Sequence, residues 1–128
     1  MNFFETNLRK IFDNVEGIEN TKYIGRTCIA DIGGGKVMIT ELDGFPVEIS
    51  GTYPTIIDTH MDQPGVIHMI TGVLVDYGVN IAGMKVFRQE KNTVAYMIIE
   101  TDQCVSEAAL AEIRDMQPVL DVKFVKPF

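Results

Sequence analysis

The chain from residue 54 onward mixes two rhythms of apolar and polar residues. A helical period of three and four runs through 64–77, where the apolar positions are Val66, Ile70, Val73, Leu74 and Tyr77. A second helix is predicted from Ser106 to about Met116, with Val105 and Leu110 placed as a hydrophobic staple. Short runs rich in β-branched and apolar residues predict strands at 55–60, 80–89, 93–101 and 120–124. The predicted order is therefore βαββαβ.

This order is typical of the ferredoxin-like α+β fold, an antiparallel four-stranded sheet with both helices on one face. The predicted middle strands are apolar on both faces, because Met97, Ile98 and Ile99 follow one another, and Met84 and Val86 add further apolar positions. The face away from the helices therefore needs a cover. We expect either the N-terminal segment or a second copy of the chain to supply it, and we predict a two-fold dimer.

The first part of the chain predicts a helix followed by a β-hairpin segment. An amphipathic helix is expected over 6–15, with Gly17 as its stop. Strands are expected at 23–32, 36–42 and 45–50, with a turn at 33–35 and a hairpin turn at 43–44. Pro46 favours an edge position for the last of these strands. Residues 51–54 form the one obvious joint, so the predicted division is 1–53 and 54–128.

Composition excludes several classes of function. The 128-residue chain has a net charge of −7, which repels phosphate backbones and argues against a nucleic-acid partner. It has no apolar run long enough for a membrane span and no signal peptide is recognised, and its two cysteines form no C-x-x-C pair. We expect a cytoplasmic protein with reduced thiols. No spacing supports a catalytic constellation, a metal site or a cofactor on this chain, and His68 is expected within a helix.

The stretch 59–67 joins a predicted strand to a predicted helix. Asp62 or Gln63 is the expected N-cap, Pro64 suits the first helical turn, and Gly65 allows close approach to the backbone. The free N–H groups of a helix start make this a candidate carboxylate site, although a well-formed helix start alone explains the same residues. The stretch 78–81, with Gly78 ending the helix, is expected at the same edge of the fold.

These two stretches carry a resemblance to a known family. Thr-Ile-Ile-Asp-Thr-His-Met-Asp-Gln-Pro-Gly-Val-Ile at 55–67, followed by Gly-Val-Asn-Ile-Ala-Gly-Met-Lys-Val at 78–86, resembles the ACT domain, an amino-acid-sensing regulatory module, over about 54–126. The segment 32–55 resembles the one before the ACT domain in the β subunit of iron–sulfur-dependent L-serine dehydratase. It is also similar to the regulatory end of D-3-phosphoglycerate dehydrogenase. The Ser-Ser-Ser-His-Thr loop of that β subunit is missing here, as are the cluster cysteines of the α part.

The resemblance implies a ligand site. His60, Asp62, Pro64 and Gly65 match an H-x-N-x-P-G motif that holds an amino acid at a dimer interface, and Asn80 matches the Asn of G-x-N-I. Asp62 departs from the family's Asn, and its carboxylate would pair with a ligand ammonium. The predicted ligand-binding residues are His60, Asp62, Gln63, Pro64, Gly65, Val66, Asn80 and Ile81. L-serine is the first candidate ligand.

The resemblance further implies a role within a larger enzyme. The chain is expected to be the regulatory, dimerising portion of a β subunit whose holoenzyme deaminates L-serine to pyruvate and ammonia, and not to be catalytic alone. Expected partners are a second copy and an α subunit that carries a 4Fe-4S cluster. Two alternatives stay open: a purely structural dimerisation module, and a regulatory domain related to D-3-phosphoglycerate dehydrogenase.

Overall fold

The computed structural model describes residues 15–16, 28–33, 36–42, 45–88 and 93–127. Its larger sheet is antiparallel in the order β1-β8-β5-β7-β6. The strands are β1 (Val15–Glu16), β5 (Thr55–Met61), β6 (Ile81–Arg88), β7 (Val94–Thr101) and β8 (Val119–Val125). The helices α2 (Val66–Asp76) and α3 (Glu107–Arg114) follow β5 and β7. The predicted ferredoxin-like βαββαβ arrangement is confirmed.

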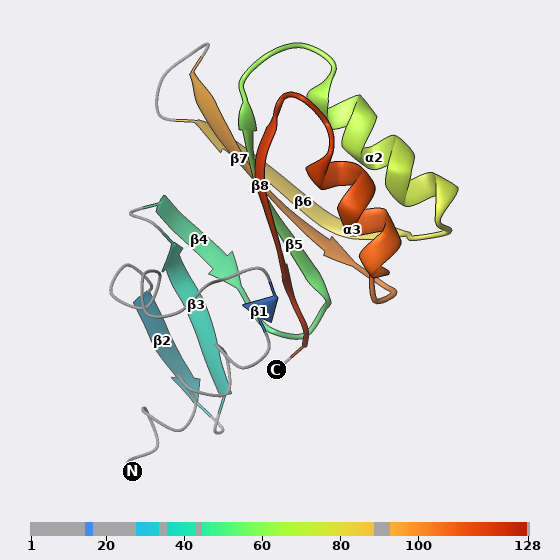
Figure 1. The fold of residues 1–128 in the computed structure, drawn as a ribbon. Coiled ribbons are helices and arrows are strands. Elements are labelled where there is room, and N and C mark those ends of the chain that lie inside the picture. The colour runs from blue at the N-terminus through green and yellow to red at the C-terminus, as the bar shows by residue number, and fades with distance from the viewer. Residues whose placement is uncertain (1–14, 17–27, 34–35, 43–44, 89–92, 128) are drawn as a thin grey trace.

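Both helices cover one face of the larger sheet, as Figure 1 shows. The core beneath them combines Ile56 of β5 and Met97 and Ile99 of β7 with Ile70 and Leu74 of α2, all completely buried. In α3 the core positions are Ala109, Leu110 and Ile113, which are spaced one, three and four apart. Apolar side chains at helical spacing thus meet the alternate residues of the strands, and hydrophobic burial holds the helices on the sheet.

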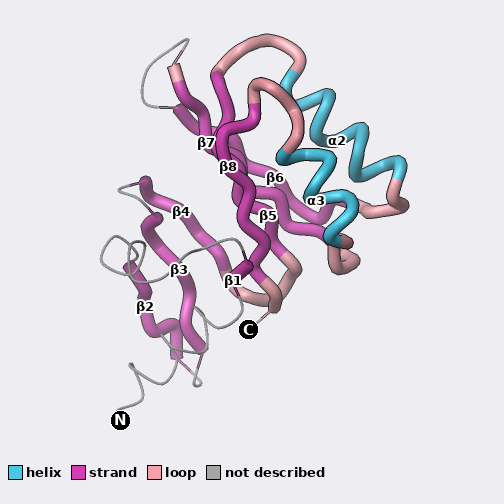
Figure 2. The backbone as a smooth tube through the Cα atoms, viewed as in Figure 1, coloured by secondary structure: helices cyan, strands magenta, loops and turns pink. Residues whose placement is uncertain are grey.

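The opposite face is covered by a second, three-stranded antiparallel sheet (Figure 2). Its strands are β2 (Cys28–Gly33), β3 (Lys36–Leu42) and β4 (Phe45–Ile49). Ile39, Val47 and Ile49 of this sheet form a buried cluster with Ile57, Ile98 and Val125 of the larger sheet. The expectation that the N-terminal segment covers this face is therefore confirmed for these residues. β4, which contains Pro46, lies at an edge as predicted.

Two helix ends follow their sequence signals. Gly78 has φ 70° and directly follows the C-cap Tyr77; its N–H donates to the carbonyl of Val75, and the N–H of Val79 donates to that of Leu74. This is the hydrogen-bond pattern of a Schellman motif, and it confirms Gly78 as the stop. At the start of α3 the Ser106 hydroxyl accepts a hydrogen bond from the Ala109 N–H at 3.2 Å.

One predicted element is wrong where the structure describes it. Val15 lies in β1, paired with Val125 of β8, and not at the end of a helix. The backbone hydrogen bonds of this pair extend the larger sheet by a short strand. The rest of the predicted helix (6–14), its stop at Gly17, and residues 23–27 of the first predicted strand lie outside the described residues.

Candidate functional site

The loop between β5 and α2 begins the helix differently from the prediction. Gly65 is the N-cap, with φ 92°, and among the described residues no side-chain hydrogen bond caps the helix there. Asp62 and Gln63 are therefore not the cap, and Pro64 lies in a turn ahead of the helix, which begins at Val66. A backbone with φ near +90° is readily adopted only by glycine, so the conformation of Gly65 explains the residue. No described atom beyond its chain neighbours lies within 4 Å of where a Cβ would be.

His60 is buried and paired with a carboxylate that the motif does not include. Its Nδ1 lies 3.2 Å from both carboxylate oxygens of Asp58, two residues earlier on β5. Both residues lie on the helix-covered face, because Asp58 pairs with Met97 and His60 with Ala95. Burial raises the pKa of Asp58 from 3.8 to about 6, although the charge and hydrogen bond of His60 act to lower it. Asp58 thus orients the His60 ring at this end of β5.

Asp62 is held by an arginine from β6. The Nη1 of Arg88 donates to Oδ2 of Asp62 at 2.8 Å, and the Asp62 N–H donates to the carbonyl of Thr93 at 2.9 Å. Arg88 and His60 both pair with Ala95 in the sheet register. The side chains of Arg88, His60 and Ala95 therefore lie on the helix-covered face. An Asp–Arg ion pair therefore stands where the family motif has a neutral Asn.

Asn80 is tied to the loop between β7 and α3. Its side-chain Nδ2 donates to Oδ2 of Asp102 at 2.7 Å, and its backbone N–H donates to Oε1 of Gln103 at 2.8 Å. The Asp102 N–H in turn donates to the Asn80 carbonyl at 3.0 Å. These bonds fix the start of β6 and place a carboxylate beside the Asn80 amide.

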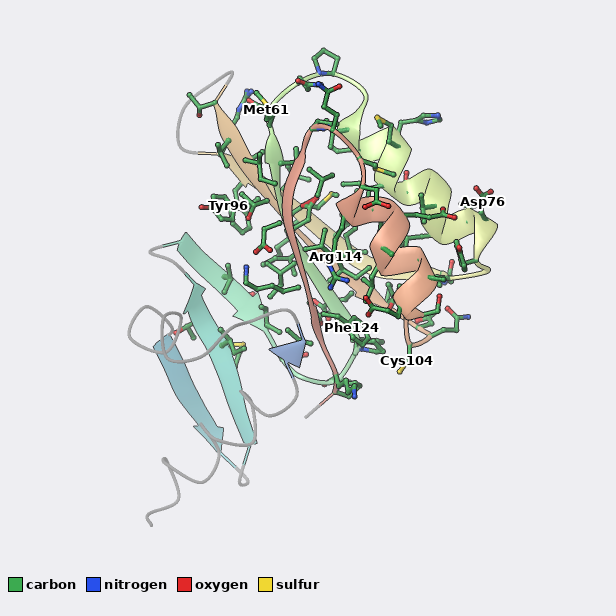
Figure 3. The ribbon with its side chains drawn as sticks, in the orientation of Figure 1. Met61, Asp76, Tyr96, Cys104, Arg114 and Phe124 are labelled. Carbon is green, nitrogen blue, oxygen red and sulfur yellow. The ribbon has the colours of Figure 1, made fainter. Side chains whose placement is uncertain are left out.

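The two halves of the predicted site lie at opposite ends of the sheet, which corrects the expectation of one shared edge. Met61 pairs with Val94 and Ile81 pairs with Thr101, the first and last residues of the eight-residue strand β7. At about 3.3 Å per residue, this separates the halves by about 23 Å. The reason is that α2 runs back along parallel strands β5 and β6. Figure 3 shows Met61 and Asp76 at the far ends of this crossover.

The remaining predicted residues are divided between surface and core. Gln63 and Pro64 are exposed beside the helix start. Val66 is almost fully buried and belongs to the core, and the half-buried Ile81 packs against it. Neither side chain is an obvious ligand contact within one copy.

Three residues near the motif were not predicted from the sequence as site residues. Asp58 had a local signal, because two polar residues at i and i+2 on an apolar strand share one face. Arg88 and Asp102 had none, since they are 26 and 22 residues away from their partners Asp62 and Asn80. The pairing of β6 with β7 brings Asp102 to Asn80, and this pairing together with that of β5 with β7 brings Arg88 to Asp62.

Neither α2 nor α3 has the length and apolar character that a membrane span would need. In the described ranges, no three His, Cys, Asp or Glu side chains are grouped so that they could hold a metal ion. Cys104, near the start of α3, is a free and exposed thiol.

Comparison with known proteins gives the chain a family. Residues 56–121 match the model of the AHAS small subunit-like ACT domain. The chain is 37% identical over 91 residues to the probable L-serine dehydratase beta chain of Bacillus subtilis, a match that covers 71% of this chain and 41% of that protein. It is 24% identical over 125 residues to the L-serine dehydratase beta chain of Peptoniphilus asaccharolyticus, covering 98% of this chain and 54% of the relative.

A second group of relatives has a different activity. Over 99 residues the chain is 32% identical to D-3-phosphoglycerate dehydrogenase of Methanocaldococcus jannaschii, which covers 77% of this chain and 19% of that enzyme. The chain therefore spans about half or less of the length of each of these relatives. The family match, which includes β5 to the start of β8 and both helices, shows that this chain belongs to the ACT domain family.

Proposed function

We propose that this chain is the amino-acid-sensing, dimerising portion of an iron–sulfur-dependent L-serine dehydratase β subunit. The similarity to two L-serine dehydratase beta chains supports the enzyme. The observation that carries the sensing role is the split site: the loop with His60 and Asp62 and the strand start with Asn80 lie at opposite ends of one sheet. A ligand that needs both halves must take them from two copies.

The edge strand β6 is suited to join two copies. In the described sheet it pairs only with β7. Met84 and Val86 lie opposite Ile99 and Met97, on the helix-covered face, yet they are 44% and 43% exposed. On the same side of the sheet, Ile67 and Val75 share a stripe of α2 and are 40% and 73% exposed. Burial of these side chains against a second copy would stabilise a dimer.

Two-fold pairing of β6 with its copy would also complete the site. In an antiparallel pair of identical strands, the start of each strand faces the end of the other. The Asn80 end of one copy then lies beside the Arg88 end of its partner, and Asp62 is bonded to Arg88. Each dimer thus holds two equivalent composite sites between its protomers.

The chemistry of these groups suits a small zwitterion. The helix start at Gly65 has no side-chain cap within the described part of the chain, so its first N–H groups and the helix dipole favour a carboxylate nearby. The carboxylate of Asp102 favours an ammonium group, whereas the carboxylate of Asp62, which was expected to do so, is already paired with Arg88. The Asn80 amide oxygen is an additional hydrogen-bond acceptor. L-serine is the first candidate because the names of two relatives, the L-serine dehydratase beta chains, contain it.

The direct test is calorimetric titration of the 128-residue chain with L-serine, glycine, L-cysteine and L-threonine, with its mass measured by sedimentation. We expect saturable binding of one amino acid to a dimer. Asp62→Ala and Asn80→Ala should each lose that binding while circular dichroism shows an unchanged fold. A dimer without heat from any of the four would contradict the sensing role and favour a purely structural module.

Mixed dimers test the composite site itself. A dimer of one Asp62→Ala copy and one Asn80→Ala copy places both substitutions in the same composite site and leaves the other intact. We expect it to bind one ligand per dimer, although neither variant binds as a homodimer. A mixed dimer that binds nothing would refute a site shared between copies.

In the holoenzyme, this portion would work with an α subunit that carries the 4Fe-4S cluster and deaminates L-serine to pyruvate and ammonia in the cytoplasm. The ACT portion would sense the amino acid and hold two β subunits together. Co-purification of the tagged chain with an α subunit, and a change in deaminase activity when Asn80 is substituted in that complex, test this part. The similarity to D-3-phosphoglycerate dehydrogenase supports a second candidate, a regulatory domain of that enzyme.

A further inference from the structure

We propose that Arg88 is the residue that selects ligands with a free carboxylate at the composite site. This inference rests on the proposed amino-acid-sensing function. It concerns a residue outside both family motifs, at the end of the edge strand β6. Two observations carry it: the ion pair that Arg88 forms with Asp62, and the accessibility of the Arg88 side chain.

Asp62 places the Arg88 guanidinium at the β5–α2 loop. The bond from Nη1 of Arg88 to Oδ2 of Asp62 measures 2.8 Å, and the Asp62 backbone is itself fixed to Thr93. Asp62 is 21% exposed, whereas the Arg88 side chain is 51% exposed. The carboxylate is thus the inner partner and the guanidinium is the one that faces solvent.

The charge of the pair explains why Asp62 is compatible with an amino-acid ligand. A carboxylate alone at this position would repel the ligand's carboxylate across the short distances of a binding site. Arg88 cancels that charge. A guanidinium has five N–H donors in a planar fork. The described chain shows one of these donated to Asp62, which leaves others for a carboxylate, and such a contact is often bidentate.

The position of Arg88 on β6 adds a second reason. Arg88 lies at the end of the strand and Asn80 immediately before its start. Two-fold antiparallel pairing of β6 therefore brings the Arg88 of one copy toward the Asn80 and Asp102 of the other. The Arg88 guanidinium of one copy then lies across the site from Asn80 and Asp102 of the other copy. That polarity matches a ligand with a carboxylate at one end and an ammonium at the other.

The test compares L-serine with L-serinamide, which keeps the ammonium and hydroxyl groups but has no carboxylate. We expect the native chain to bind L-serine and to bind L-serinamide at least about tenfold more weakly, since a charged hydrogen bond contributes about 1.5–3 kcal/mol. Arg88→Ala should weaken L-serine binding by about 10- to 100-fold. It should not weaken binding of L-serinamide, because that ligand has no carboxylate for Arg88 to hold and its ammonium is not repelled by the unpaired Asp62. Arg88→Lys should retain part of the difference, because it keeps the charge without the planar fork.

Lys85→Ala is the matched control, because it removes a cation from the same strand. Lys85 pairs instead with Glu48 of the second sheet, at 3.5 Å. The Lys85→Ala variant should keep the native preference for L-serine over L-serinamide. Equal loss of both ligands in Arg88→Ala, or an unchanged preference, would overturn the role of Arg88 while amino-acid sensing stands. Failure of the native chain to bind any amino acid would overturn the proposed function and this inference with it.

Discussion

The start of α2 allows a sharp test of why Gly65 is glycine. Its φ is 92°, and a Cβ added there would meet no described atom within 4 Å. An alanine at this position would therefore suffer backbone strain without a steric clash. That strain is about 1–2 kcal/mol for a residue forced into the left-handed region. We expect Gly65→Ala to lower the free energy of unfolding by that amount.

Gly72 is the matched control within the same helix. It lies inside α2 and a Cβ would likewise meet nothing within 4 Å. Because glycine in a helix interior costs about 0.5–1 kcal/mol relative to alanine, Gly72→Ala should raise stability by that amount. Both variants replace glycine with alanine, but one should be less stable and the other more stable than the native chain. Their free energies of unfolding should therefore differ from each other by about 2 kcal/mol.

Urea denaturation followed by circular dichroism measures both changes, and thermal unfolding should show a shift of about 4 °C for each kcal/mol. Gly65→Asn provides a further check, because asparagine enters the left-handed region more readily than alanine and should recover part of the loss. If Gly65→Ala proved as stable as Gly72→Ala, the strained helix start described above would be incorrect.

Three further predictions concern other parts of the fold. Ser106→Ala removes the hydroxyl that accepts the Ala109 N–H, and should cost about 1 kcal/mol in urea denaturation. Asp58 has its pKa raised to about 6 by burial, so the folded state keeps a proton that the unfolded state releases above pH 3.8. Stability should therefore fall as the pH rises from about 4 to about 6, by about 3 kcal/mol, and Asp58→Asn should remove this dependence; a parallel pH profile in the variant would contradict it. Val86→Lys on the edge strand should reduce self-association in sedimentation without lowering stability, since Val86 is 43% exposed; an unchanged dimer would point to another interface.

Local signals in the sequence were sufficient to predict a helix boundary wherever residues close in the chain form that boundary. Gly78 ends α2 and Ser106 begins α3 because each acts through backbone groups within a few positions. The start of α2 was predicted less well. Asp62 or Gln63 was predicted as the N-cap, and aspartate is a common capping residue, yet Gly65 is the N-cap. The side chain of Asp62 instead accepts a hydrogen bond from Arg88, and its backbone N–H donates to the Thr93 carbonyl.

The sequence by itself determined the βαββαβ order and the motif that places this chain among ACT domains, because helical and strand periodicities and turn residues are local properties. Only the tertiary structure decided that the two motif halves lie at opposite ends of the sheet, since a crossover helix returns the chain to the starting end of a parallel strand. It alone brought Arg88 to Asp62 and Asp102 to Asn80, because strand pairing joins residues far apart in the chain.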